Sequence, residues 1–153
     1  MYRGYLSAYV PYTDCCVSLS NMNLKIRKYN PTLDYENLIK LVQSEGEEWK
    51  DYLNPIYHRA LENSITYVAM IGSELCGYSR SMNDSGIFIW VIDLLVNKSW
   101  RGFSIGKELM ECIVTDYPDI DVLVMSDVDE YYEKIGYEKE GSIFKVKRTL
   151  CKT

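Results

Sequence analysis

The hydrophobic positions of the chain repeat with two different periods, which divide most of its length into candidate strands and helices. Residues 24–29, "LKIRKY", predict a first strand. Residues 34–44, "DYENLIKLVQS", place Leu38, Leu41 and Val42 on one face of an amphipathic helix that ends at Gly46. Residues 47–64 predict a second helix, which Pro55 interrupts.

The middle of the chain is apolar and typical of strands. Residues 65–82, "ITYVAMIGSELCGYSRSM", predict two strands joined by a tight turn at Gly72 and Ser73. The turn "NDSG" then leads into residues 87–96, "IFIWVIDLLV", a nearly continuous apolar run. Such a run is buried on both faces, so we expect it at the centre of a sheet.

The last third of the chain alternates helix and strand again. Apolar residues from Ile105 onward recur at helical spacing, and this helix stops before Pro118. Residues 121–126 predict a short buried strand, and residues 128–136 predict a short helix capped by Gly136. In residues 142–150, "SIFKVKRTL", Phe144 and Val146 alternate with lysines, which predicts a final strand with one wet face.

Together these elements predict an α/β fold with a mixed central sheet and helices on both faces. Residues 1–21 differ from the rest: Pro11 and Asp14 interrupt them and no continuous apolar core occurs, which disfavours a secretory signal. We expect Met22 to be a functional start, with 1–21 a leader and 22–153 one domain. The alternative, in which tyrosines of the leader pack as an extra edge element, stays open.

Charge and cysteine content narrow the classes of function. The 153 residues carry a net charge of −5, which argues against a nucleic-acid partner, and the longest apolar run is too short to span a membrane. The five cysteines are an odd number without a CxxC spacing, as expected of free thiols in a reducing cytoplasm. His58 is the only histidine, so we expect neither a metal site nor a Cys–His nucleophile.

Residues 96–110, "VNKSWRGFSIGKELM", join the central strand to a helix through a glycine-rich corner. Backbone N–H groups at such a corner have no helical partner and bind anions, often phosphates. A Walker P-loop requires four residues between its glycines, whereas three separate Gly102 from Gly106, and Glu108 follows Lys107. The dinucleotide fingerprint also fails, because the chain contains no Gly-x-Gly.

A third pattern, Arg/Gln-x-x-Gly-x-Gly/Ala, fits with Arg101, Ser104 and Gly106 at its defining places. This resembles the acyl-CoA-binding loop of the GNAT superfamily of N-acetyltransferases, although Ser104 departs from the usual glycine. Residues 131–141, "YYEKIGYEKEG", resemble the family's Tyr-Glu-Lys-Leu-Gly-Phe signature, at the family's expected order and separation. The resemblance covers nearly all of the chain after the leader.

The resemblance implies acetyl-CoA as co-substrate. Its diphosphate would lie on backbone N–H groups of the loop, and its pantetheine arm would pair with the backbone of the preceding strand. The same strand residues can also be ordinary core. The residues expected to bind acetyl-CoA are Leu94, Leu95, Val96, Arg101, Gly102, Phe103, Ser104, Ile105, Gly106 and Lys107.

Acyl transfer to an amine requires the amine to lose a proton and the CoA thiolate to gain one. The resemblance implies Tyr132 as the acid that protonates the thiolate, with its neighbour Tyr131 as the rival. Asp93 is the one charge inside an apolar strand, where a carboxylate is costly unless paired or working. It is our candidate for handling the amine, and an ion pair with Arg80 is the equal alternative.

Further acidic residues could attract a basic acceptor. Glu47, Glu48 and Asp51 lie where the family's substrate-facing helices occur, although a solvated helix face explains them better. Asp127 and Asp129 could line the acceptor channel, and helix capping explains them equally well.

These observations predict a cytoplasmic N-acetyltransferase that transfers an acetyl group from acetyl-CoA directly to a primary amine. The amine belongs to a small molecule or a protein, and a homodimer is compatible with the sequence. One rival is a non-catalytic acyl-CoA-binding regulatory module, for which Ser104 leaves room. A second is a structural α/β domain whose glycine corner is only a turn.

Overall fold

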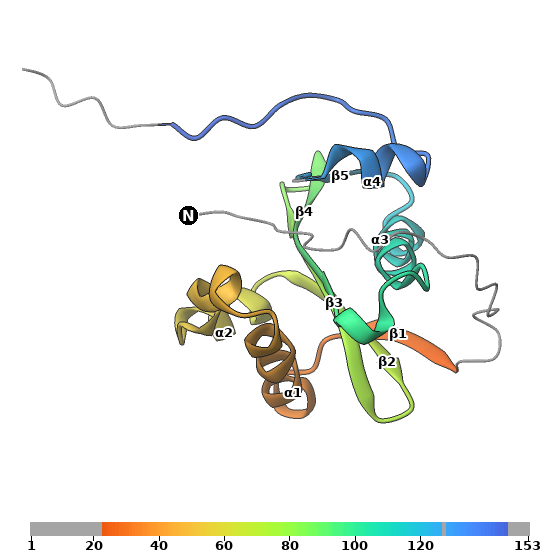
Figure 1. The fold of residues 1–153 in the computed structure, drawn as a ribbon. Helices are drawn as coiled ribbons and strands as arrows, with labels where there is room; N and C mark the ends of the chain where they lie inside the picture. The colour runs from red at the N-terminus through yellow and green to blue at the C-terminus, as the bar shows by residue number, and fades with distance from the viewer. Residues whose placement is uncertain (1–22, 127, 147–153) are drawn as a thin grey trace, which may run out of the picture.

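A computed structural model describes residues 23–126 and 128–146, and a five-stranded sheet forms its centre (Figure 1). The strands lie side by side in chain order: β1 Leu24–Lys28, β2 Ile65–Ile71, β3 Glu74–Asn83, β4 Phe88–Val96 and β5 Asp121–Val124. The first four are antiparallel to their neighbours, whereas β5 runs parallel to β4. The mixed sheet predicted from the sequence is therefore confirmed.

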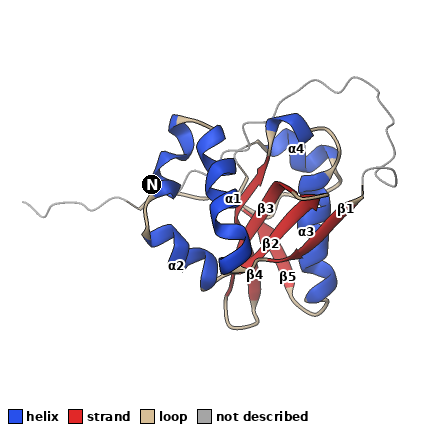
Figure 2. Cartoon of the chain, turned by 90° about the horizontal axis from the view of Figure 1, so that it is seen from below, coloured by secondary structure: helices blue, strands red, loops and turns tan. Residues whose placement is uncertain are grey.

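Helices cover both faces of this sheet, as predicted (Figure 2). One face carries α1 Pro31–Ser44, the 3-10 helix η2 Glu47–Leu53 and α2 Ile56–Glu62. The other face carries α3 Ile105–Asp116 and α4 Asp129–Lys134, and a 3-10 turn, η3 Lys98–Trp100, leads from β4 towards α3. Each face has its own apolar core, so the central strands are buried on both sides.

Helix α1 begins one turn earlier than the hydrophobic period predicts, because Asn30 caps it. The side chain of Asn30 accepts hydrogen bonds from the backbone N–H groups of Thr32 and Leu33, at 3.0 and 3.2 Å. In return, the carboxylate of Asp34 accepts the Asn30 N–H at 2.7 Å and two hydrogen bonds from Arg27, at 2.6 and 2.7 Å. This reciprocal cap fixes the first turn of α1 to the end of β1.

The final strand predicted for residues 142–150 is wrong in the part that the structure describes. Residues 142–146 have no regular secondary structure, and Phe144 and Val146 are almost fully exposed. Alternation favours a strand only where a neighbouring strand supplies hydrogen bonds, and in the described part of the chain β5 pairs with β4 alone. The predicted leader 1–21, Met22 and Asp127 lie outside the described residues.

Candidate active site

The end of β4 has an unpaired edge. Strand β4 pairs with β5 only as far as Val91 and Val124, followed by one hydrogen bond from Met125 N to Val91 O at 3.3 Å. Within the described residues, positions 92–96 pair with β3 alone. The register against β3 also shifts here, because Arg80 faces Asp93 whereas Ser81 faces Val91. The bulge lies where β4 leaves β5, and beyond it the backbone groups of β4 that face β5 are available to a ligand.

The glycine corner follows this open edge. Gly102 and Ser104 both adopt positive φ, +86° and +59°, which turns the chain sharply into α3. The first helical hydrogen bond runs from Glu108 N to Ser104 O at 3.0 Å. The backbone N–H groups of positions 104–107 make no hydrogen bond to any residue that the structure describes. Four free amides at the positive end of a helix fit an anionic diphosphate.

At Gly106, helix α3 lies close to side chains of both β4 and α4. A Cβ at this position would lie 3.1 Å from Tyr131 Oη, 3.6 Å from Leu94 Cδ2 and 3.8 Å from Val96 Cγ2. The hydroxyl of Tyr131 therefore lies over the first turn of α3, beside the open end of β4. Burial raises the pKa of Tyr131, so the hydroxyl keeps its proton at neutral pH.

Tyr132, the acid expected from the resemblance, lies deeper in the protein. It belongs to the apolar core under α3, and its ring stacks on that of Tyr137 with centroids 6.3 Å apart. The ring of Tyr131 packs edge-on against Tyr132 at 5.1 Å. The two tyrosines thus occupy different positions, and it is the hydroxyl of Tyr131 that lies at Gly106.

The other residues expected at the acetyl-CoA site have side chains in different surroundings, either in one of the two apolar cores or against Trp100. Leu94 and Val96 belong to the core under α3 and Leu95 to the core under α1, so these side chains pack while their backbone lies at the open edge. Phe103 packs edge-on against Trp100, with ring centroids 6.2 Å apart.

The two basic side chains of the corner both have carboxylate partners. The buried side chain of Arg101 donates to Glu45 Oε2 at 2.6 Å and to Val96 O at 2.9 Å. Lys107 Nζ lies 3.5 Å from Glu111 Oε1 on the partly exposed side of α3. Of the two, only Lys107 has its charged end near solvent, so the backbone amides carry most of the anion-binding capacity of the corner.

Asp93 lies on the opposite face of the sheet, in a buried polar network. Its Oδ2 accepts hydrogen bonds from Arg80 Nε at 2.5 Å and from Tyr57 Oη at 2.8 Å. Tyr57 Oη also lies 2.8 Å from Tyr78 Oη, and Arg80 lies over the Tyr57 ring. The expected ion pair with Arg80 is therefore present. Asp93 Oδ1 is buried and has no hydrogen-bond partner within the described residues.

Burial and neighbouring charge shift the pKa values in this network. Burial raises the pKa of Tyr57 far above its ordinary value, and the nearby Tyr78 and Asp93 raise it further. Burial alone would lower the pKa of Arg80, but attraction to Asp93 reverses this and raises it. Sequence reasoning missed Tyr57 and Tyr78, and the only signal towards them was the charge of Asp93 in an apolar strand.

The remaining acidic candidates lie at the surface. Glu47, Glu48 and Asp51 are exposed on η2, and Glu47 pairs with Lys50 at 2.9 Å. Asp129 pairs with Lys139 at 2.5 Å. No group of three or more His, Cys, Asp or Glu side chains suited to a metal occurs in the described ranges.

None of the helices in those ranges is long and apolar enough to cross a membrane.

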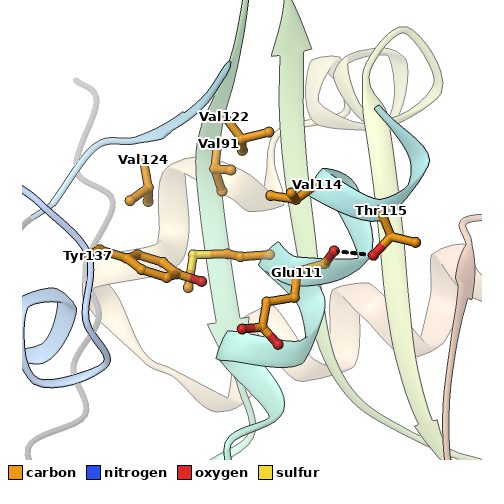
Figure 3. A pocket seen from close by; sticks show the side chains of 8 residues that line it. Val91, Glu111, Val114, Thr115, Val122, Val124 and Tyr137 are labelled. Atoms are coloured by element: carbon orange, nitrogen blue, oxygen red, sulfur yellow. Dashed lines mark hydrogen bonds between the residues drawn. The ribbon is translucent and has the colours of Figure 1, made fainter. Parts of the chain in front are cut away.

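A groove of about 500 Å³ lies elsewhere, between α3 and the β4–β5 pair (Figure 3). Val91, Val122 and Val124 form its apolar floor, with Glu111 and Tyr137 at its sides. None of its lining residues belongs to the glycine corner or to positions 92–96. The groove is therefore separate from the site formed by the corner and the open strand.

Comparison with known proteins agrees with this geometry. The family described as acetyltransferase (GNAT) domain matches residues 62–139, which include β4, the glycine corner and α4. An uncharacterized ycf52-like N-acetyltransferase of Prochlorococcus marinus is 27% identical over an alignment of 135 residues, and the match covers 82% of this chain and 74% of that protein.

Solved structures show the same fold. A GNAT family acetyltransferase from Streptococcus pneumoniae has a TM-score of 0.65 and 23% identity, over 82% of this chain and 99% of its own. An aminoglycoside acetyltransferase from an uncultured soil metagenomic sample has a TM-score of 0.68 and 22% identity, over 87% of this chain and 99% of its own.

The open end of β4 beside a helix with free amides is the arrangement that the resemblance to acyltransferases implies for this α/β domain. The family match spans half of the chain, and the chain belongs to the GNAT acetyltransferase family. The protein is an acyltransferase, as the sequence predicted.

Proposed function

We propose that this protein transfers the acetyl group of acetyl-CoA directly to a primary amine. The observation that carries the proposal is the group of four free backbone amides at positions 104–107, beside the unpaired end of β4 and below the Tyr131 hydroxyl. Anion-binding amides, an edge for an amide-bearing arm and a proton donor are what this reaction requires.

Acetyl-CoA supplies the acyl group as a thioester. The amides of positions 104–107 and the dipole of α3 hold its diphosphate, and the exposed end of Lys107 adds charge. The backbone of Leu94, Leu95 and Val96 extends the sheet towards the pantetheine arm. A backbone N–H of this edge also stabilises the oxyanion that forms during transfer. Because the amine attacks the thioester directly, the reaction needs no covalent intermediate with the protein.

A tyrosine of α4 protonates the leaving thiolate. The position of the Tyr131 hydroxyl at Gly106 favours Tyr131 for this role. Tyr132, which the family resemblance favours, remains the alternative, because its helix position differs by only one residue. Substitution of each tyrosine separates the two assignments.

The acceptor amine must lose a proton, since an alkylamine has a pKa of about 10. Asp93 supports this step through Oδ1, which has no hydrogen-bond partner among the described residues, while Oδ2 stays bound to Arg80 and Tyr57. Of the exposed carboxylates on η2, Glu47 is already paired with Lys50, and Glu48 favours a cationic acceptor. Some neighbours of similar fold are named aminoglycoside acetyltransferases, so aminoglycosides belong among the amines tested.

Titration calorimetry with acetyl-CoA, followed by CoA release with a panel of amines, tests the proposal. We expect binding of acetyl-CoA and turnover with at least one small amine, seen as a mass increase of the product by one acetyl group. Binding without turnover on any amine would favour the regulatory module. If adding acetyl-CoA produced neither a heat of binding nor thermal stabilisation, the protein would not bind acetyl-CoA, and the hypothesis of a structural α/β domain would be the one left.

A further inference from the structure

Glu45 is a buried carboxylate at the end of α1, far in sequence from the glycine corner. Its backbone N–H donates to Val42 O at 3.1 Å, and the N–H of the next residue, Gly46, donates to Gln43 O at 3.3 Å, which closes the last turn of α1. Its side chain is only 1% exposed, and Oε2 accepts a hydrogen bond from Arg101 Nη2 at 2.6 Å. A buried charge requires such a partner, because desolvation is otherwise uncompensated.

Arg101 connects Glu45 to the open end of β4. While Nη2 binds Glu45, Nε donates to the carbonyl oxygen of Val96, the last residue of β4, at 2.9 Å. Helix α1 belongs to one face of the sheet and α3 to the other. One guanidinium therefore fixes three elements at a single point: the end of α1, the end of β4 and the first residue of the glycine corner.

Apolar contacts hold the middle of the corner, because Phe103 packs against Trp100 and Ile105 is buried in the core under α3. Gly102 and Ser104 are exposed and both adopt positive φ, and within the described residues no side chain caps the start of α3. Arg101 is the side chain that fixes where the turn begins, so it influences the direction of the free amides at positions 104–107. Arg101 in turn is neutralised by Glu45, so its charge does not point outward to an anion.

We propose that Glu45 is a positioning residue for acetyl-CoA, which acts through Arg101 to hold the glycine corner in its anion-binding shape. The inference rests on the proposed function, since it assumes that the corner binds the diphosphate. It assigns to α1, on the face of the sheet opposite α3, a role in binding acetyl-CoA.

The test compares acetyl-CoA affinity in Glu45→Gln with that of the wild type, by titration calorimetry and by KM. We expect the dissociation constant and KM to rise about tenfold, a typical size for coupling between contacting residues, with kcat at saturation nearly unchanged. Glu36→Gln is the matched control, because Glu36 lies on the exposed side of the same helix, and its affinity should equal that of the wild type.

A double-mutant cycle with Arg101→Gln shows whether Glu45 acts through Arg101. The double variant should bind acetyl-CoA no more weakly than either single variant. If Glu45→Gln does not fold, Glu45→Asp keeps the charge but shortens the side chain, and it should show a smaller loss of affinity in the same direction. Circular dichroism establishes which variants are folded.

Unchanged affinity in a folded Glu45→Gln or Glu45→Asp variant would overturn the inference, provided that the wild type binds acetyl-CoA. Additive losses in the cycle would overturn it as well. Failure of the wild type to bind acetyl-CoA would instead remove the proposed function. The two failures are therefore distinguishable in one series of titrations.

Discussion

Arg80 and Asp93 face each other across β3 and β4 as a buried ion pair, with Nε and Oδ2 2.5 Å apart. The pair lies at the bulge where β4 leaves β5, and Tyr57 donates a further hydrogen bond to the same carboxylate oxygen. The contact thus stabilises the place where the sheet opens. It explains why a carboxylate is tolerated in the apolar strand.

Asp93→Asn should lower the free energy of unfolding by about 3 kcal/mol, because it leaves the Arg80 charge buried without its partner. Urea unfolding at neutral pH measures this loss. Adding Arg80→Met should recover about half of it, since both charges are then absent. Lys50→Gln, which breaks the exposed pair with Glu47, serves as control and should leave stability nearly unchanged. A loss below that of the control would contradict a stabilising pair.

Tyr131→Phe should lower kcat about a hundredfold while leaving acetyl-CoA affinity unchanged, because it removes the hydroxyl at Gly106 but keeps the ring. Tyr132→Phe should lower kcat much less. Steady-state rates with a saturating amine, together with calorimetric affinities, give the comparison. The reverse order of the two effects would return the acid role to Tyr132.

The sequence predicted the order and type of most elements, because hydrophobic period and glycine or proline are local signals. Pro55 divided the second helix, and Gly72 formed the turn between β2 and β3, as expected. Residue patterns in the sequence also indicated the glycine corner, and they marked Asp93 as an unusual charge inside an apolar strand. Contacts between distant segments were not: nothing local pairs Glu45 with Arg101, or brings Tyr57 to Asp93.

The same limit explains the wrong final strand. The alternation around Phe144 describes which side of a strand would be apolar, but a strand forms only beside a partner. Tyr131 and Tyr132 are neighbours in the sequence, so their positions alone could not show which of the two hydroxyls lies near Gly106. Only the fold determines this.

Gly106→Val should weaken acetyl-CoA binding, because the added side chain would crowd Tyr131 Oη and the leucine and valine of β4. Where the overpacking cost of roughly 1–3 kcal/mol falls on the shape of the corner that binds acetyl-CoA, it corresponds to a loss of affinity of about fivefold to 150-fold. Calorimetric titration measures it. Gly141→Val is the control, since a Cβ there meets no atom within 4 Å. Equal affinities in the two variants would count against the role of the corner.

Ser104→Gly should stabilise the protein slightly, by about 0.5 kcal/mol. The left-handed conformation of Ser104 costs about 1–2 kcal/mol, and the greater freedom of glycine in the unfolded chain offsets part of the gain. Gly102→Ala, at φ +86°, should instead destabilise by about 1 kcal/mol. Urea unfolding of both variants checks the opposite signs, and a stabilising Gly102→Ala would refute the strain argument.

The Arg27–Asp34 contact should make stability depend on pH in the acid range. Burial alone would raise the pKa of Asp34, but hydrogen bonds from Arg27 and from the Asn30 N–H lower it below its ordinary value. Because the folded pKa is the lower one, the stabilisation is complete above the unfolded pKa of about 3.9 and is lost as the pH falls through the folded value.

Asp34→Asn should therefore cost about 2 kcal/mol at pH 7, a size typical of hydrogen bonds to a charged group. The difference from the wild type should shrink as the pH falls below 4, since the wild-type carboxylate then takes up its proton. Urea unfolding of both proteins between pH 7 and the lowest pH at which they still fold traces this convergence. A difference that stayed constant over that range would mean that the Asp34 charge contributes nothing to the cap of α1.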